Sequence, residues 1–548
     1  MNCDDVEMTP TSNIWGGFET MAITGSLMGR EKNREREKEP DTRAGLRWTG
    51  HAFVDVGIAG ACAYAQRERP EDLTLNDLDE VSKFMVETYY QAKLGTYLSC
   101  VFMNASFVQP NESAAKRQQF IEHYCRAHRA EPDPRVNGLR CVFSGLPATS
   151  PLVRTHLPLF SAENIVNFRP GGETFVPAAG VVIVCLLFLP MASVRSEGRL
   201  LAVHADDPRI TLAFARRYLE NNRRLIALRL PEERKLVHDE YEREIPMWDI
   251  GKKRYKFADA KGPRSLVVAD LTEIAAASAP SELRPRPAAL SAYLLSNSGQ
   301  GPSLEIFHVP SGVIEFVRRA AGATTRAAWN RIATGFRPVI ESSGESSVMR
   351  HGRRRAARQQ IPGRAGWSRN PAFEEICDIF EAGFTDPGRA ARWLRKYVLG
   401  DIKTAGRRAS ENDIAGAWSL AELFLGEVLG MNKSRVEAIR SFADKLADWI
   451  GGANDRKLLH ALTFDKPWEL RGALLRAQRE SARTQLLFGL DEFANVWLSQ
   501  EGDEYLVRDL VCLRVVEKLH ESGYLTAHPE AVTAAPREEA SPPEEVTA

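Results

Sequence analysis

The pattern of hydrophobic and polar positions divides the chain into a mixed part and an all-helical part. In residues 45–340, helical periodicity alternates with short apolar runs. The clearest helix covers 73–90, where four apolar side chains recur on one face: Leu75, Leu78, Val81 and Met85. A second helix is predicted over 210–219, and β-like runs occupy 101–102, 140–143, 266–268 and 304–308. These elements lack the regular alternation of a doubly wound sheet, so the pattern predicts an α+β body.

From 371 to 526 the apolar spacing predicts helices almost throughout. Ser434 and Glu437 have the spacing of a capping box, and Gly451 and Gly452 are predicted to end the helix that follows. The apolar stripe of that helix is Ile439, Phe442, Ala443, Leu446, Trp449 and Ile450. Another helix is predicted to begin at 410–413 and to bury Ile414, Trp418, Ala421, Leu425 and Val428. Helices near 373–382, 387–399, 481–498 and 504–522 complete a bundle of about six.

Three segments lack this periodicity. Residues 1–44 contain the charged run 31–40 and are predicted to form a disordered tail, as is the acidic end at 527–548. Residues 341–370 are predicted to be an Arg-rich loop or linker. The predicted fold class is therefore α+β, with a mixed N-terminal body at 45–340 followed by a C-terminal all-α helical bundle at 371–526.

Charge is neutral overall but unevenly distributed. The chain has 72 Lys and Arg and 72 Asp and Glu, so net charge alone indicates no partner. Residues 318–410, however, hold 19 basic and 8 acidic side chains. A local excess of this size favours contact with a polyanion in that region.

Cysteine usage and hydropathy point to a reducing compartment. Eight cysteines are scattered without a CxxC pair, which is typical of a cytoplasmic protein. The longest apolar run, 178–189, is too short to span a bilayer and is predicted to be a buried element. No membrane partner is expected.

No motif assembles a catalytic site, so the sequence predicts no enzyme, no catalytic residue, no cofactor and no metal. A P-loop and an HExxH motif are both absent. Two partial metal sets have simpler interpretations. In the first, His204, Asp206 and Asp207 precede Pro208, and an Asp at that place is expected to cap the next helix. The second is an incomplete zinc set in which Ser144 stands where a fourth ligand would be: Cys125, His128, Cys141 and Ser144.

Four stretches, in order, resemble the large subunits of type I CRISPR Cascade complexes, especially those of subtypes I-B and I-A. They are WTGHAFVDVG at 48–57, LSCVFMN at 98–104 with Phe107, CVFSGLPA at 141–148, and NFRPGG at 167–172 followed by Gly180 and an apolar run to Pro190. The chain departs from that pattern at several positions. His51 and Ala52 replace Asn and Pro, Met103 replaces Pro, and Ser144 replaces the second Cys.

The resemblance implies a non-catalytic subunit of an RNA-guided surveillance complex in antiviral defence. Such a subunit binds target DNA near the flanking motif, assists strand opening and recruits a helicase–nuclease in trans. The implied partners are guide RNA, target DNA and the other Cascade subunits. Base pairing with the guide would read the sequence, and protein would read the flanking motif and the backbone.

The candidate nucleic-acid contacts lie in three places. The stretch 350–369 contains seven arginines and no acid, and Trp367 in it could stack on a base. Asn104 could contact a base edge or serve only as a turn residue, and beside Asn167, Arg169 could bind phosphate or cap a helix. The arginines expected to bind are Arg350, Arg353, Arg354, Arg355, Arg358 and Arg364. The alternative for them is a solvated loop that contacts nothing in particular.

The first of the four stretches is interpreted as mainly architectural. Gly50 and Gly57 allow tight turns or close packing, and Asp55 is expected to cap a helix that begins near Gly57. Two rival functions remain open. One is a stand-alone nucleic-acid-binding regulatory protein, and the other is a metal-dependent nuclease that uses His204, Asp206 and Asp207.

Overall fold

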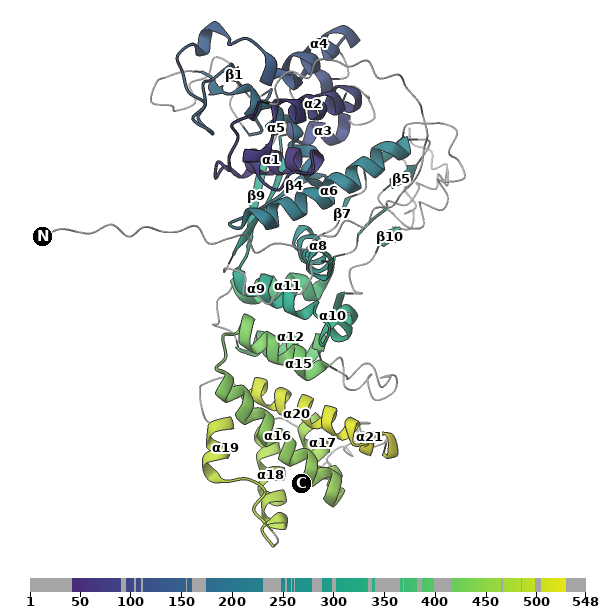
Figure 1. Ribbon diagram of the computed structural model, residues 1–548. Helices are drawn as coiled ribbons and strands as arrows, with labels where there is room; N and C mark the ends of the chain where they lie inside the picture. The colour runs from purple at the N-terminus through teal and green to yellow at the C-terminus, as the bar shows by residue number, and fades with distance from the viewer. Residues whose placement is uncertain are drawn as a thin grey trace, which may run out of the picture. The chain divides into compact units, whose positions relative to one another are not determined.

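The structure is a computed structural model of the chain (Figure 1). It describes residues 42–89, 95–102, 105–109, 112–153, 155–159, 174–229, 248–251, 254–257, 259–260, 262–277, 288–297, 302–333, 338–340, 365–367, 369–381, 387–398, 416–464, 467–483, 485–497 and 504–528. Within these residues, no helix is both long enough and apolar enough to cross a membrane.

The centre of the described fold is a seven-stranded sheet in the order β10-β11-β7-β3-β4-β8-β9. Its long strands form an antiparallel set, and the short strand β7 runs parallel to both β3 and β11. The strands are β3 Val194–Ser196, β4 Arg199–Ala205, β7 Asp259–Ala260, β8 Leu290–Ser296, β9 Ser303–Val309, β10 Pro338–Ile340 and β11 Ala365–Trp367. Two separate antiparallel pairs join β1 Ser150–Leu152 to β2 Val176–Ala178 and β5 Trp248–Gly251 to β6 Arg254–Phe257.

One face of the sheet packs against the N-terminal helices. They are α1 Ala52–Tyr64, α2 Leu75–Tyr89, α3 Gly95–Phe102, α4 Ala114–Cys125 and α5 Gly180–Phe188, with 3₁₀ turns at Pro70–Asp72, Ser106–Val108, Ala127–Arg129, Pro134–Val136 and Leu189–Ala192. Every residue of α5 is buried, which confirms the buried element predicted from its apolar run. Leu200 and Ala202 of β4 and Leu295 of β8 belong to this core.

The helix α6 Pro208–Arg229 lies beside β4 (Figure 1) and contributes side chains to two cores. Leu212, Ala215 and Leu219 pack with the N-terminal helices. Phe214 and Tyr218 pack into a second core behind the other sheet face. The helix therefore has apolar side chains on two sides, and each side packs into a different core.

The second core continues from the sheet into the C-terminal helices. It joins Phe307 of β9 to Trp393, Phe442 and Leu510 without a break at the predicted linker. The helices on this side are α8 Pro263–Ala277, α9 Ser311–Ala320, α10 Arg326–Ala333, α11 Pro371–Glu381, α12 Pro387–Trp393, α15 Ala417–Leu423, α16 Lys433–Ala453, α17 Arg456–Phe464, α18 Pro467–Ser481, α19 Leu490–Trp497, α20 Glu504–Glu521 and α21 Tyr524–Ala527. Single π-helical segments follow α12 at Leu394–Val398 and α15 at Phe424–Val428. The predicted fold class, a mixed body followed by helices, is confirmed.

Several local predictions are wrong, and the errors have a common cause. Residues 101–102 and 266–268 are helical, in α3 and α8, and 140–143 contributes only one bridge, from Arg140 to Pro147. An apolar run of two or three residues carries too little periodicity to separate a strand from a buried helix. The strand at 304–308 and the helix at 73–90 are confirmed as β9 and α2.

Helix ends also differ from the predictions. Asn432, not Ser434, caps α16, because its Oδ1 accepts from the Ser434 backbone N–H at 3.0 Å. The helix passes Gly451 and Gly452 and ends at Ala453. The segment predicted as one helix over 481–498 is divided into the end of α18 and α19, and α17 and α18 were not predicted. The predicted helix start at 410–413 lies outside the described residues.

Asp55 does not cap the helix that was expected near Gly57. Helix α1 begins at Ala52, and His51 is its N-cap. Asp55 sits in the first turn and reaches back to the preceding loop, where it accepts hydrogen bonds from Thr49 N at 2.8 Å, Thr49 Oγ1 at 2.7 Å and Gly50 N at 2.9 Å. The carboxylate therefore fixes the loop before the helix instead of the helix start.

Candidate nucleic-acid interface

The predicted contact residues all fall in parts of the chain that the structure does not describe. This applies to Asn104, Asn167, Arg169, Arg350, Arg353, Arg354, Arg355, Arg358 and Arg364. What the structure does describe is how the chain enters and leaves the six arginines. We call residues 341–364, which hold all six, the arginine segment.

The arginine segment joins two adjacent strands of the central sheet. Strand β10 precedes it and β11 follows it, and the two pair in antiparallel register with Ile340 opposite Ala365. The backbone of Trp367 takes part in this pairing, opposite Pro338. Strand β11 also pairs in parallel with β7, so the returning chain lies inside the sheet. Both ends of the segment are thus held at neighbouring positions of one sheet.

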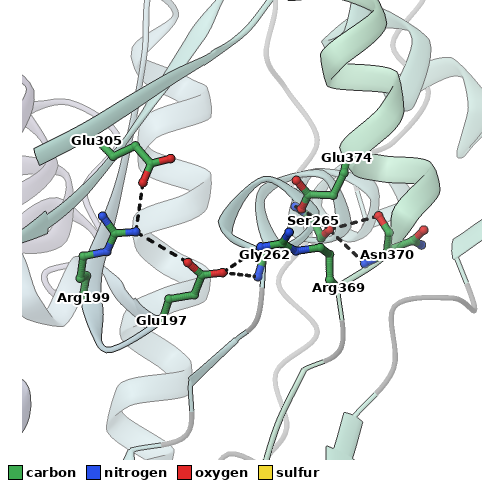
Figure 2. A network of polar contacts seen from close by, with 8 residues as sticks. All are labelled: Glu197, Arg199, Gly262, Ser265, Glu305, Arg369, Asn370 and Glu374. Atoms are coloured by element: carbon green, nitrogen blue, oxygen red, sulfur yellow. Dashed lines mark hydrogen bonds and ion pairs between the residues drawn. The ribbon is translucent and has the colours of Figure 1, made fainter. Parts of the chain in front are cut away.

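A network of charged and polar residues lies around Arg369 and Asn370, just beyond the strand β11 that follows the arginine segment (Figure 2). Glu197 Oε1 accepts from the Gly262 N–H at 3.1 Å and pairs with Arg369 Nη2 at 3.2 Å. Arg199 Nη2 lies 3.6 Å from Glu197 Oε2 and 3.0 Å from Glu305 Oε2. Arg369, the last of the seven arginines singled out in the sequence, is therefore engaged with a carboxylate of the protein itself.

Glu197 holds this place through an unusual backbone conformation. It has a φ of 51° and Gly198 has a φ of 78°, and together they form the two-residue turn between β3 and β4. Positive φ at both positions is typical of a type I′ hairpin, in which Asn or Asp is usual at the first position. The turn directs the Glu197 carboxylate toward the start of α8 and toward Arg369 (Figure 2).

Asn370 fixes the chain between β11 and α11, shortly after the arginine segment. Its side chain caps α11 by accepting from the Ala372 N–H at 2.9 Å and donates to the Ile332 carbonyl of α10 at 3.1 Å. Its own N–H donates to Ser265 Oγ of α8 at 3.0 Å, and the Ser265 hydroxyl donates to Glu374 at 2.6 Å. Asn370 is 1% exposed and Ser265 is fully buried. Buried bonds of this kind contribute about 1 kcal/mol each, more than the exposed Arg369 pair.

Other described arginines nearby are also paired with acids. Arg264 and Arg389 share the carboxylate of Asp378, the second at 3.0 Å. Arg319 pairs with Glu427, and Arg318 pairs with Glu315 at 2.6 Å. The stretch 350–364, in contrast, contains no acidic residue of its own. The described arginines near Asn370 are therefore paired with acids of the protein, whereas the stretch 350–364 offers its arginines no acid close by in the sequence.

The two partial metal sets do not come together. His204 Nε2 lies 3.3 Å from Asp55, Asp206 accepts from Ala289 N at 3.3 Å, and Asp207 accepts from the Arg209 N–H at the start of α6. The expected capping role of an Asp before Pro208 is confirmed for Asp207.

Both thiols of the zinc set are buried, and neither belongs to a group of side chains that could bind a metal among the described residues. Cys125 and Cys141 lie in the N-terminal core, and burial raises the pKa of Cys125. His128 bonds Asp79 at 2.8 Å, and burial lowers its pKa although Asp79 opposes that change. Across the described residues, no three His, Cys, Asp or Glu side chains gather closely enough to hold a metal ion.

The described parts of the stretches that carry the Cascade resemblance meet in one core, and 167–172 lies outside the described residues. Gly57 of α1 packs so closely on α5 that an added Cβ would lie 2.1 Å from the Cys185 carbonyl oxygen. The rings of His51 and Phe143 are 5.0 Å apart, and Val142 N–H donates to the Pro177 carbonyl at 3.2 Å. The close packing predicted for Gly57 is confirmed. These stretches are part of the architecture of the N-terminal helices.

Sequence reasoning missed most of the residues that anchor the arginine segment. Asn370 followed by Pro371 is a readable helix start, because Asn favours the N-cap and Pro the first helical position. Nothing in the local sequence singles out Glu197 or Ser265, nor, elsewhere in the fold, the pair between Asp55 and His204. These contacts depend on elements that are far apart along the chain.

The described residues define an α+β protein in which an arginine-bearing connection joins two neighbouring strands of the main sheet. The chain matches no protein-family model, and no curated protein or solved structure is significantly similar to it. Support for a function therefore comes from the chain's own residues, contacts and charges.

Proposed function

We propose that the protein binds a polynucleotide through the six arginines of 350–364. The observation that carries this proposal is the concentration of arginine in 350–364, which has six Arg and no Asp or Glu. Three described arginines close to Asn370 or in the helices it contacts, Arg369, Arg264 and Arg389, have carboxylate partners. The six arginines between the anchored ends have no Asp or Glu within 350–364. A concentration of arginine without acids among its sequence neighbours favours phosphate as its partner.

The anchoring geometry supports the same proposal. Because Ile340 and Ala365 are paired, the six arginines are tethered at both ends to one sheet. Tethering both ends reduces the conformational entropy that binding would remove. If all six contact phosphates of duplex DNA, the affinity should fall with salt with a logarithmic slope of about −5.

The more specific proposal is that the chain acts as a non-catalytic large subunit of an RNA-guided type I CRISPR complex. Its support is the set of four resembling stretches, three of which the structure places partly in one core. In this role the cytoplasmic chain would bind guide RNA and target DNA, together with other Cascade subunits and a helicase–nuclease. Asn104, Asn167 and Arg169 would contact the target near its flanking motif.

The binding proposal is tested by removing three charges and measuring salt dependence. The triple variant Arg353→Gln/Arg354→Gln/Arg355→Gln should weaken binding to duplex and single-stranded DNA and to RNA, and should reduce the salt slope by about 3. A matched control removes the same charge from exposed arginines on α18 and just after it: Arg471→Gln/Arg479→Gln/Arg483→Gln. Equal losses in the two variants would reduce the effect to net charge and would overturn the proposal.

Purification separates the assembly proposal from its rivals. Tagged protein expressed with its genomic neighbours should retain short RNA of uniform length and several partner subunits. Recovery of the chain alone, with DNA binding intact, would indicate a stand-alone regulator instead. A nuclease would be revealed by Mg²⁺- or Mn²⁺-dependent cleavage that is lost in Asp206→Ala/Asp207→Ala.

A further inference from the structure

Strand β9 forms an end of the central sheet, and its outer edge has no strand partner among the described residues. All seven of its residues pair with β8 on the inner side, from Leu290 opposite Val309 to Ser296 opposite Ser303. In an antiparallel ladder, every second residue of such an edge strand directs its N–H and C=O outward. The outer edge of β9 thus presents main-chain groups that another strand could bind.

The usual protection of an edge strand is missing here. Proteins block edges with lysine, proline, bulges or inward-pointing charge. Strand β9 has no lysine or proline, and its register with β8 is continuous. Its single acid, Glu305, is neutralised by Arg199 at 3.0 Å. The edge is therefore long, regular and without an uncompensated carboxylate.

An apolar strip accompanies this edge on one sheet face. Leu304 is 43% exposed and Ile306 is 46% exposed, and both lie on the same face because their positions differ by two. Tyr293 of β8 is directly opposite Ile306, and its ring lies 5.7 Å from that of Phe53. The strip therefore runs from the first turn of α1 across β8 to the outer strand.

We propose that β9 pairs with β9 of a second copy of this chain, in antiparallel register about a two-fold axis at Ile306. A two-fold axis perpendicular to the sheet leaves the same face of both copies on one side. Residues directly opposite each other must also point to the same face, so the axis has to lie between two copies of the same residue. Centring on Ile306 pairs all seven residues, with Leu304 opposite His308 and Glu305 opposite Phe307. Centring on Glu305 would place two like charges directly opposite each other, which is unfavourable.

Self-pairing of this kind explains the exposed strip. Each copy would place its Ile306 beside the other, and each Leu304 would lie beside a histidine instead of water. The two seven-stranded sheets would become continuous. This inference is independent of the nucleic-acid proposal, because it uses neither the arginine segment nor its anchor.

Light scattering coupled to size exclusion tests the pairing. The full-length chain should show a concentration-dependent dimer, and Leu304→Lys/Ile306→Lys should shift it to monomer while the circular dichroism spectrum stays unchanged. The matched control is Leu486→Lys/Leu490→Lys, which alters apolar residues that are 64% and 82% exposed, the first just before α19 and the second at its first residue. A monomeric wild type, or a dimer that is lost equally in the control, would overturn the inference.

A cysteine placed on the axis tests the register. In a Cys3→Ser background, Ile306→Cys should give a covalent dimer on mild oxidation, because opposite residues of paired strands have Cβ atoms about 4.5–5.5 Å apart. Leu490→Cys should not. A dimer that crosslinks through position 490 and not through 306 would show that the copies meet elsewhere. A monomer whose β9 amides are protected from hydrogen exchange would show that another part of the chain occupies the edge.

Discussion

Replacing Gly57 with alanine tests the packing that brings the N-terminal helices together. Gly57 lies within α1, and a Cβ built there would stand 2.1 Å from the Cys185 carbonyl oxygen and 2.7 Å from its carbon. A carbon normally approaches a carbonyl oxygen no closer than about 3.3 Å. The atoms it would meet are main chain of α5, which is buried along its whole length. No side-chain rotation can relieve this contact, so the two helices would have to separate by about 1 Å.

The magnitude follows from two opposing effects. Overpacking a buried site costs about 1–3 kcal/mol and more when backbone must move, and we take about 3 kcal/mol here. Alanine is favoured over glycine inside a helix by about 1 kcal/mol. Gly57→Ala should therefore lower the free energy of unfolding by about 2 kcal/mol or more.

Gly452→Ala is the matched control. Gly452 lies in the last turn of α16, and an added Cβ there would meet nothing within 4 Å. This variant should be neutral or more stable by up to about 1 kcal/mol. Urea unfolding followed by tryptophan fluorescence and circular dichroism would compare both variants with wild type. If Gly57→Ala were as stable as Gly452→Ala, the close approach of α1 to α5 would be refuted.

Two further predictions concern single polar groups. Burial raises the pKa of Asp55, but hydrogen bonds from His204 and the Thr49 loop outweigh burial and hold that pKa below its ordinary value. The carboxylate should therefore stabilise the fold above about pH 4 and lose this effect as the pH falls further. In urea melts, Asp55→Asn should have a much lower free energy of unfolding than wild type at pH 7, and the difference should shrink near pH 3. A difference that does not change with pH would contradict this. Asn432→Ala should lower the free energy of unfolding by about 1 kcal/mol, while Glu437→Ala should change it little. The reverse order would favour the capping box of Ser434 and Glu437 that the sequence predicted.

The charge distribution could be interpreted only in part from the sequence. The local excess of basic residues and the absence of acids in 350–364 are composition, and counting establishes them. Which arginines are already paired is decided by folding. Arg369 meets Glu197, which is 172 residues away along the chain, and Arg264 meets Asp378, which is 114 residues away. A count of charges therefore overstates the number of free cations near the anchor.

Local periodicity determined the elements that are long and one-sided. The α2 face of Leu78, Val81 and Met85, the buried α5 and the inner stripe of α16 follow from side chains spaced along one helix. Such patterns act over one or two turns, so they can be read without knowing the rest of the fold. The fold class, a mixed body followed by helices, follows from the same kind of evidence.

Tertiary structure alone decided what surrounds the arginine segment. Strands β10 and β11 are three residues each and pair across 24 intervening residues, as Ile340 and Ala365 show. Elsewhere in the fold, Asp55 meets His204 across 149 residues. Short strands have almost no intrinsic preference for one partner, and their pairing is selected by the burial and hydrogen bonding of the whole assembly. The sequence therefore shows that a basic stretch exists, and only the folded chain shows that one sheet holds both of its ends.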